Sequence, residues 1–182
     1  KLGMNVKVII TDGSEPIGYG VGPVLEAKDV LSVLKNDPAA PQDLQKKSLM
    51  MAGLLLEMTG KSKQGKGLDY AQEILESGKA LKKMNEIIAA QGKKGMPKRG
   101  QFGIAVKSGK IGRVQEIDNE IIAKIARIAG APDDKGAGIF IIKKVHDMIK
   151  KGDLLYTVYV ENKFKQELVQ EFLKENKGYV IR

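Results

Sequence analysis

Hydrophobic positions in the first half of the chain recur mostly at the spacing of amphipathic helices. Apolar residues three and four apart predict helices over residues 23–34, 44–58, 67–74 and 79–90. Pro23 suits the first helical position, because its missing N–H would have no partner there. The β-branched run at residues 6–11 is instead typical of a buried strand. Residues 49–56 are apolar nearly all round, so we expect that part of the second helix to be buried between layers.

The second half of the chain alternates short strands with two helices. The pattern predicts strands at residues 104–107, 111–114, 139–142, 154–160 and 179–181. The turn Ser108-Gly109-Lys110 is expected to join the first two of them as a hairpin. Helices are predicted at residues 119–129, with Asp118 as cap and Gly130 as stop, and at residues 163–175.

These patterns divide the chain into two units and a connector. Residues 1–91 contain one predicted strand followed by helices, residues 92–103 form a glycine-rich basic connector, and residues 104–182 have an α+β pattern. A single strand cannot form a sheet, so we expect the first unit to be the incomplete C-terminal part of an α/β domain whose partners lie upstream. Such a unit would expose apolar surface, which a domain swap or homo-oligomer would cover.

The positive charge is concentrated in the connector. The chain has a net charge of +9, and four basic residues without an acid fall between residues 92 and 103: Lys93, Lys94, Lys98 and Arg99. Only four of the 31 basic residues are arginine, and specific readers of phosphate and guanine usually rely on arginine. Aromatic residues make up 5% and do not alternate with basic ones in a strand that could stack bases. We therefore expect no nucleic-acid partner.

The remaining composition excludes cysteine chemistry and bears on where the protein is expected to be found. The chain has no cysteine, which excludes disulfides, thiolate metal ligands and thiol nucleophiles. Its apolar runs are too short to span a bilayer and no signal-peptide pattern is visible, so a cytoplasmic protein without a membrane partner is expected. Heavy use of lysine without cysteine or tryptophan is compatible with a thermophile.

The segment from Ile10 to Ala27 is the most informative part of the sequence. It reads as a strand, a turn at Asp12-Gly13-Ser14-Glu15-Pro16, three glycines at alternate positions and a helix start. Glycine lets the backbone approach a ligand and a helix N-terminus favours negative charge, so the loop could be an anion cradle. The spacing matches neither a dinucleotide fingerprint nor a P-loop, and a tight structural turn is the alternative.

The whole string resembles the strand–loop–helix of thymidine and pyrimidine-nucleoside phosphorylases. The ending Gly22-Pro23-Val24-Leu25-Glu26-Ala27 is closer to the archaeal AMP phosphorylases. The resemblance continues at Gly53-Leu54-Leu55-Leu56-Glu57-Met58, Gly136-x-Gly138-Ile139 and Lys151-Gly152-Asp153-Leu154-Leu155. It implies a fold of class α/β plus α+β, in which the remnant of the phosphorylase α/β domain is followed by a C-terminal α/β-hammerhead-like module.

The function implied by this resemblance is that of a pentosyltransferase. The reaction is reversible phosphorolysis, with AMP and phosphate giving adenine and ribose 1,5-bisphosphate. A thymidine or pyrimidine-nucleoside phosphorylase is the alternative, and a non-enzymatic basic binding or assembly module is a further one. The family's phosphate-gripping segments do not match any part of this chain. No catalytic or cofactor-binding residue is therefore assigned, and the chain is expected to act as scaffold and to be inactive alone.

One family site does map onto the sequence. In the bacterial enzymes of the family a potassium ion is held by two loop carbonyls and an acid on the next helix. The matching positions here are Ile17, Gly20 and Asp29. Oxygen ligands of this kind suit a hard cation. The resemblance thus implies potassium as a cofactor of the parent enzyme, whereas the chain itself requires none.

The single histidine is a weaker chemical candidate. His146 precedes Asp147, which suggests an acid–base pair. Neighbouring residues in a strand point to opposite faces, so adjacency does not make them a dyad. We expect His146 to lie at the surface or in a turn.

Overall fold

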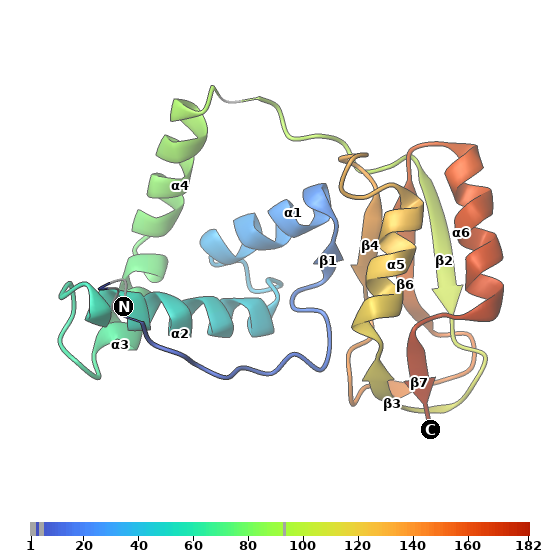
Figure 1. The fold of residues 1–182 in the computed structure, drawn as a ribbon, viewed down its shortest axis with the longest axis horizontal. Helices are drawn as coiled ribbons and strands as arrows, with labels where there is room; N and C mark the ends of the chain where they lie inside the picture. The colour runs from blue at the N-terminus through green and yellow to red at the C-terminus, as the bar shows by residue number, and fades with distance from the viewer. Residues whose placement is uncertain (1–2, 4–5, 93) are drawn as a thin grey trace.

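The first unit of the protein is a group of helices. The structure is a computed structural model that describes residues 3, 6–92 and 94–182, so Lys93 of the connector lies outside the described residues. The helices are α1 (Pro23–Leu34), α2 (Gln42–Met58), α3 (Gly67–Glu76) and α4 (Lys79–Ala90) (Figure 1). They share a small core around Val33, Ala40 and Leu75. The sequence pattern therefore located all four helices, with bounds that differ by at most two residues.

The second unit is a mixed α+β structure with antiparallel sheets. Its elements are β2 (Phe102–Lys107), β3 (Gly112–Ile117), α5 (Asn119–Ala129), β4 (Gly138–Ile141), β5 (Met148–Ile149), β6 (Leu154–Val160), α6 (Lys163–Glu175) and β7 (Tyr179–Ile181). Strands β4, β6 and β2 lie side by side in one sheet, and β5, β3 and β7 form a second sheet. The cap at Asp118 is confirmed, because its carboxylate accepts the N–H groups of Glu120 and Ile121.

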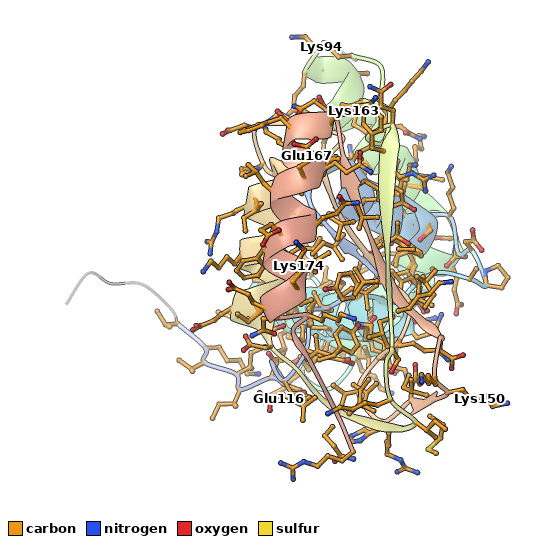
Figure 2. The ribbon with its side chains drawn as sticks, turned by 90° about the vertical axis from the view of Figure 1, so that its right-hand side faces the viewer. Lys94, Glu116, Lys150, Lys163, Glu167 and Lys174 are labelled. Atoms are coloured by element: carbon orange, nitrogen blue, oxygen red, sulfur yellow. The ribbon has the colours of Figure 1, made fainter. Side chains whose placement is uncertain are left out.

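Helices α5 and α6 pack on the larger sheet and close the main core. Helix α5 contacts β4 and β6, and α6 contacts β2 and β6. Figure 2 shows Lys163, Glu167 and Lys174 along α6, where all three are exposed. The buried side of the unit is aliphatic with one tyrosine, and its fully buried side chains include Ile117, Ile122, Ile125, Ile139, Ile141, Ile149, Leu155, Tyr156, Val158 and Val160.

A strand from the first unit completes the larger sheet. Strand β1 (Gly20–Val21) pairs antiparallel with β4, with Gly20 opposite Phe140 and Val21 opposite Ile139. The ring of Tyr19 lies 5.9 Å from that of Phe140, which adds an aromatic contact at the same place. The sheet order is therefore β1-β4-β6-β2, and the sheet includes residues from both sides of the connector.

The predicted hairpin at Ser108-Gly109-Lys110 is wrong. Strand β2 pairs with β6, whereas β3 pairs with β5 and β7. The turn passes the chain from one sheet to the other, because Ser108 exchanges backbone hydrogen bonds with the turn after β5: its N–H donates to Asp153 and its carbonyl accepts from Gly152. These long-range partners outweigh local pairing.

Two predictions of burial in the first unit are also wrong. Residues 6–11 form no strand, and Val8 and Ile10 are 83% and 99% exposed. In the apolar part of α2, Met51 and Leu55 are 48% and 59% exposed. The described chain supplies neither a neighbouring strand nor a layer to cover them. Exposed apolar surface in this unit, which the sequence also predicted, is confirmed.

Among the described residues, no helix combines the length and the apolar character that crossing a bilayer requires.

The double change Met51→Glu and Leu55→Glu tests the exposed face of α2. Both side chains reach solvent, so the free energy of unfolding should change by less than about 0.5 kcal/mol. The added charges should lower the fluorescence of a dye that binds apolar surface. They should also shift the chain from oligomer to monomer in light scattering, because like charges repel across an interface.

Ile111→Glu is the control, since Ile111 is 75% exposed on the second unit, and it should change neither readout. An oligomer that survives the double change, or a wild-type chain that is monomeric and binds no dye, would contradict this assignment.

Candidate functional site

The loop that precedes α1 is held by carboxylates of the helices behind it. Asp29 on α1 is only 7% exposed, and its Oδ2 atom accepts the N–H groups of Tyr19 and Gly20, each at 2.7 Å. A buried carboxylate is costly unless hydrogen-bonded, and an unpaired buried amide is costly as well. Each group therefore satisfies the other. We call residues 15–22 the carboxylate-capped loop.

Two further carboxylates complete the capping of this loop. The N–H of Gly18 donates to Asp43 Oδ2 on α2 at 3.0 Å. The N–H of Gly22 donates to Glu26 Oε1 on the first turn of α1 at 2.8 Å. The carboxylates of Asp43 and Glu26 thus extend the capping to both ends of the bend.

Lys144 joins the carboxylate-capped loop to the second unit. Its ammonium lies 3.0 Å from Asp43 Oδ2 and 2.5 Å from the Pro16 carbonyl, and it is 4.0 Å from Glu15 Oε1. The N–H of the next residue, Val145, donates to Glu15 Oε2 at 2.8 Å. The Lys144 side chain is only 18% exposed, so this ion pair is less screened by solvent than a surface pair.

The surroundings of Asp43 favour its ionised form. Burial alone would raise the pKa of Asp43, but the hydrogen bond and charge of Lys144 and the N–H groups of Leu44 and Gly18 outweigh it. The pKa of Asp43 is therefore lowered from its ordinary value. The carboxylate is charged at neutral pH and holds α2, the loop and the second unit together.

Glycine is required where the loop passes its carboxylates. Gly18 has a φ of +72°, and a Cβ there would lie 2.7 Å from Asp29 Oδ2. A Cβ at Gly20 would lie 2.8 Å from the N atom of Glu26. The alternate glycines therefore allow backbone to approach an acid and a helix terminus closely.

This geometry decides between the two interpretations of the loop. An anion cradle needs free backbone N–H groups, but those of residues 18, 19, 20 and 22 donate to the protein's own carboxylates. The loop is a structural turn around negative charge.

The three residues predicted to hold potassium lie near one another. Ile17 and Gly20 are in the carboxylate-capped loop, and Asp29 reaches that loop from α1. Asp29 Oδ2 is already occupied by two amides, whereas Oδ1 accepts no hydrogen bond from the described residues. One free carboxylate oxygen and two carbonyls are a donor set that suits a hard cation. The potassium site stays a prediction.

A cavity of about 350 Å³ lies beside the loop. Ile17, Asp43 and two lysines of α2, Lys46 and Lys47, contribute to its lining. The Lys47 ammonium donates to the carbonyl of Asp12, which also lines the cavity. The N–H of Ser14 donates to the Asp12 carboxylate and holds the pKa of Asp12 below its ordinary value. Charges of both signs therefore surround this space.

The remaining chemical candidates give no further site. His146 lies in a turn with a φ of +76° and donates its backbone N–H to the Val114 carbonyl, as expected for a turn residue. Among the residues that the structure describes, no three histidine, aspartate or glutamate side chains are grouped so as to hold a metal.

Sequence reasoning missed Asp43, Glu15 and Lys144. Lys144 lies 101 residues from Asp43 along the chain, and no spacing rule connects them. Asp29 was found, but as a metal ligand and not as the acceptor of two loop amides.

Replacing Asp29 tests the capping of the loop. Asp29→Ala should lower the free energy of unfolding by about 2–4 kcal/mol, because two amides lose their acceptor inside the protein. Asp29→Asn keeps one acceptor oxygen, which can accept both amides, and loses only the charge, so it should be less destabilising than Asp29→Ala. Chemical denaturation measures both. A loss below about 0.5 kcal/mol for Asp29→Ala, the range of ordinary surface changes, would contradict the role of this carboxylate.

Acid titration tests the Asp43–Lys144 pair. Because the folded pKa of Asp43 is lowered, the unfolded state binds more protons as acid is added, and stability is lost as pH falls through the folded pKa. Asp43→Asn removes this contribution, so stability should fall less steeply between about pH 5 and pH 2 than in the wild type.

Asp133→Asn is the matched control, because this exposed carboxylate has no hydrogen bond among the described contacts. It should leave the slope unchanged. Equal slopes for the wild type and Asp43→Asn would show that Asp43 does not stabilise the folded state through its charge.

Comparisons with known proteins match the whole chain. The family model described as the pyrimidine nucleoside phosphorylase C-terminal domain matches residues 113–179. A Methylococcus capsulatus protein named "Putative thymidine phosphorylase" is 43% identical over 182 residues, which are 100% of this chain and 35% of that protein. A protein of the same name from Rhodopseudomonas palustris strain BisA53 is 47% identical over 180 residues, which are 98% of this chain and 35% of its own length.

A third protein of that name, from Bradyrhizobium sp. strain ORS 278, is 44% identical over 182 residues, which are 100% of this chain and 36% of its length. The chain thus spans about a third of the length of these bacterial relatives. The match over residues 113–179 shows that the chain carries the C-terminal domain of the pyrimidine nucleoside phosphorylase family, and these identities show that the chain as a whole is similar to part of proteins named as thymidine phosphorylases.

Proposed function

We propose that this chain is the C-terminal scaffold of a cytoplasmic pentosyltransferase that catalyses reversible phosphorolysis of a nucleoside or nucleotide. In that reaction a phosphate oxygen forms a bond to the anomeric carbon, the carbon–nitrogen bond to the base breaks, and the base leaves with a proton. The products are the free base and a sugar 1-phosphate. The scaffold's second unit is then the hammerhead-like module of the family.

The carboxylate-capped loop carries this proposal. The family-like string between residues 10 and 27 forms a rigid bend whose polar groups bind one another: Asp29 and Asp43 accept loop amides, and Lys144 pairs with Asp43. Groups used in this way hold a shape and do not take part in proton transfer or in the attack of phosphate on the anomeric carbon. The chain's contribution is therefore to position a wall beside the reacting groups of a longer protein, and we expect the chain alone to be inactive.

Two substrates are candidates for the longer protein. The sequence Gly22-Pro23-Val24-Leu25-Glu26-Ala27, which resembles AMP phosphorylases, favours AMP. The names of the relatives, which are 43% to 47% identical, favour thymidine. AMP would give adenine and ribose 1,5-bisphosphate, and thymidine would give thymine and a deoxyribose phosphate.

We also propose that potassium binds at Ile17, Gly20 and Asp29 in the longer protein. The support is the Oδ1 atom of Asp29, which accepts no hydrogen bond from the described part of the chain and lies beside the loop that carries the other two residues. A potassium ion there would add positive charge that fixes the loop further.

Release of free base from AMP, thymidine and uridine in the presence of phosphate tests the proposal. The 182-residue chain should release none, and the longer protein should phosphorolyse one of the three. Replacing potassium by sodium at equal ionic strength should lower that activity, and potassium should raise the melting temperature relative to sodium.

Turnover by the 182-residue chain would contradict the scaffold role, and no turnover of any substrate by the longer protein would contradict the phosphorolysis. Equal activity and equal melting temperature in the two salts would contradict only the potassium site.

A further inference from the structure

A small cavity on the second unit has a strongly basic rim. It has a volume of about 230 Å³ and lies between the turn that follows β2 and the residues around β7. Lys107, Lys110 and Lys177 line it, and within the described ranges no acidic residue does so. Its other side is largely apolar, formed by Leu155, Tyr179 and Ile181.

The turn that carries Lys110 is fixed by hydrogen bonds of Ser108. Ser108 is buried, and its backbone is tied on both sides: its N–H donates to the Asp153 carbonyl at 2.9 Å and its carbonyl accepts from Gly152 at 2.8 Å. Its hydroxyl donates to the Lys110 carbonyl at 2.8 Å and accepts the Lys110 N–H at 3.1 Å. Lys110 therefore extends from a backbone that needs no rearrangement to receive a ligand.

Lys177 is placed on the opposite side by equally specific contacts. The buried Tyr156 donates its hydroxyl to the Lys177 carbonyl at 2.9 Å. The Lys177 ammonium reaches the carbonyl of Lys107 at 3.2 Å. This contact places the Lys177 ammonium at the end of strand β2, beside the backbone of Lys107. Three lysines from two segments of the chain thus line one cavity.

The charge of these lysines is uncompensated in the described part of the chain. None of the three forms an ion pair with a carboxylate there, although seven other lysine–carboxylate contacts are present. Burial raises the pKa of Tyr179, whose hydroxyl donates to the Lys143 carbonyl at 2.7 Å. The phenol is therefore neutral and does not repel an anion. Bringing an anion to this cavity relieves repulsion among like charges.

We propose that this cavity binds a small phosphate monoester with an apolar organic part. The phosphate lies among the ammonium groups of Lys107, Lys110 and Lys177, which suit a doubly charged anion with several acceptor oxygens. The organic part packs against Ile181 and the ring of Tyr179, the two partly exposed apolar residues of the lining. No residue of this cavity belongs to the carboxylate-capped loop. A test of this binding site is therefore independent of a test of the proposed phosphorolysis.

Titration of the 182-residue chain with phenyl phosphate, followed by the backbone amide signals in NMR spectra, tests the site. Phenyl phosphate should bind saturably and more tightly than inorganic phosphate, which lacks the apolar part, and than phenol, which lacks the charge. The amides that shift should be those of Gly109, Lys110 and Gly178. The double change Lys110→Ala and Lys177→Ala should weaken binding about tenfold, as expected for the loss of two exposed charge contacts.

The control is Lys94→Ala with Lys163→Ala. This pair removes the same charge, both residues are exposed and neither lines the cavity, and Figure 2 shows both at the upper end of the molecule, far from Lys150 and the end that carries β7. It should leave the affinity within about twofold of the wild type, the range expected of remote surface charges.

Four outcomes would overturn the proposal. They are the absence of saturable binding, amide shifts confined to other parts of the chain, equal weakening by the two double changes, and equal affinity for phenyl phosphate and inorganic phosphate. Equal weakening would mean general attraction to a positive surface, and equal affinity would mean a site for free phosphate only.

Discussion

The bonds from loop amides to the carboxylates of Asp29 and Asp43 are the constraint on which the arrangement of this chain depends. Neither partner is stable alone in this place, because a desolvated carboxylate and an unpaired amide both lose hydrogen bonds to water. Together they fix the bend at residues 18–20. The bend then delivers β1 to the edge of β4, so a few polar contacts decide where the larger sheet ends.

Besides the pairing of β1 with β4, further contacts join the first unit and the connector to the second unit. Lys144 of the second unit pairs with Asp43 of α2 beside the capped loop. The end of the connector is fixed on the second unit, because the Gly100 N–H donates to the Gly136 carbonyl and Arg99 lies 4.1 Å above the ring of Tyr159. Figure 1 shows the connector passing from α4 to β2, away from the loop. A domain boundary drawn at residues 92–103 would therefore separate β1 from the rest of the larger sheet, which contains strands from both units.

Local structure could be predicted from the sequence, whereas long-range contacts could not. Helix periods and caps are set by residues three or four apart, which is why α1, α4, α5 and α6 were found with their bounds. The failures at Ser108-Gly109-Lys110 and at residues 6–11 have another cause. Strand pairing and burial depend on partners that lie far away in the sequence. The pattern of alternating hydrophobic residues does not identify those partners. At the site, the family-like string located the loop and Asp29. The pairing of Lys144 with Asp43 and the direction of the loop amides could not be predicted, because they depend on tertiary packing.

Hydrogen exchange of the amides of Gly18, Tyr19 and Gly20 in the folded chain tests the central claim most directly. If carboxylates cap the loop, these three amides should be protected to a degree comparable with those paired between β4 and β6, although they belong to a glycine-rich bend. Asp29→Ala should remove the protection of Tyr19 and Gly20 while leaving the β4–β6 amides protected. Exchange of the three amides in the wild type as fast as that of the exposed residues 6–11 would contradict the account.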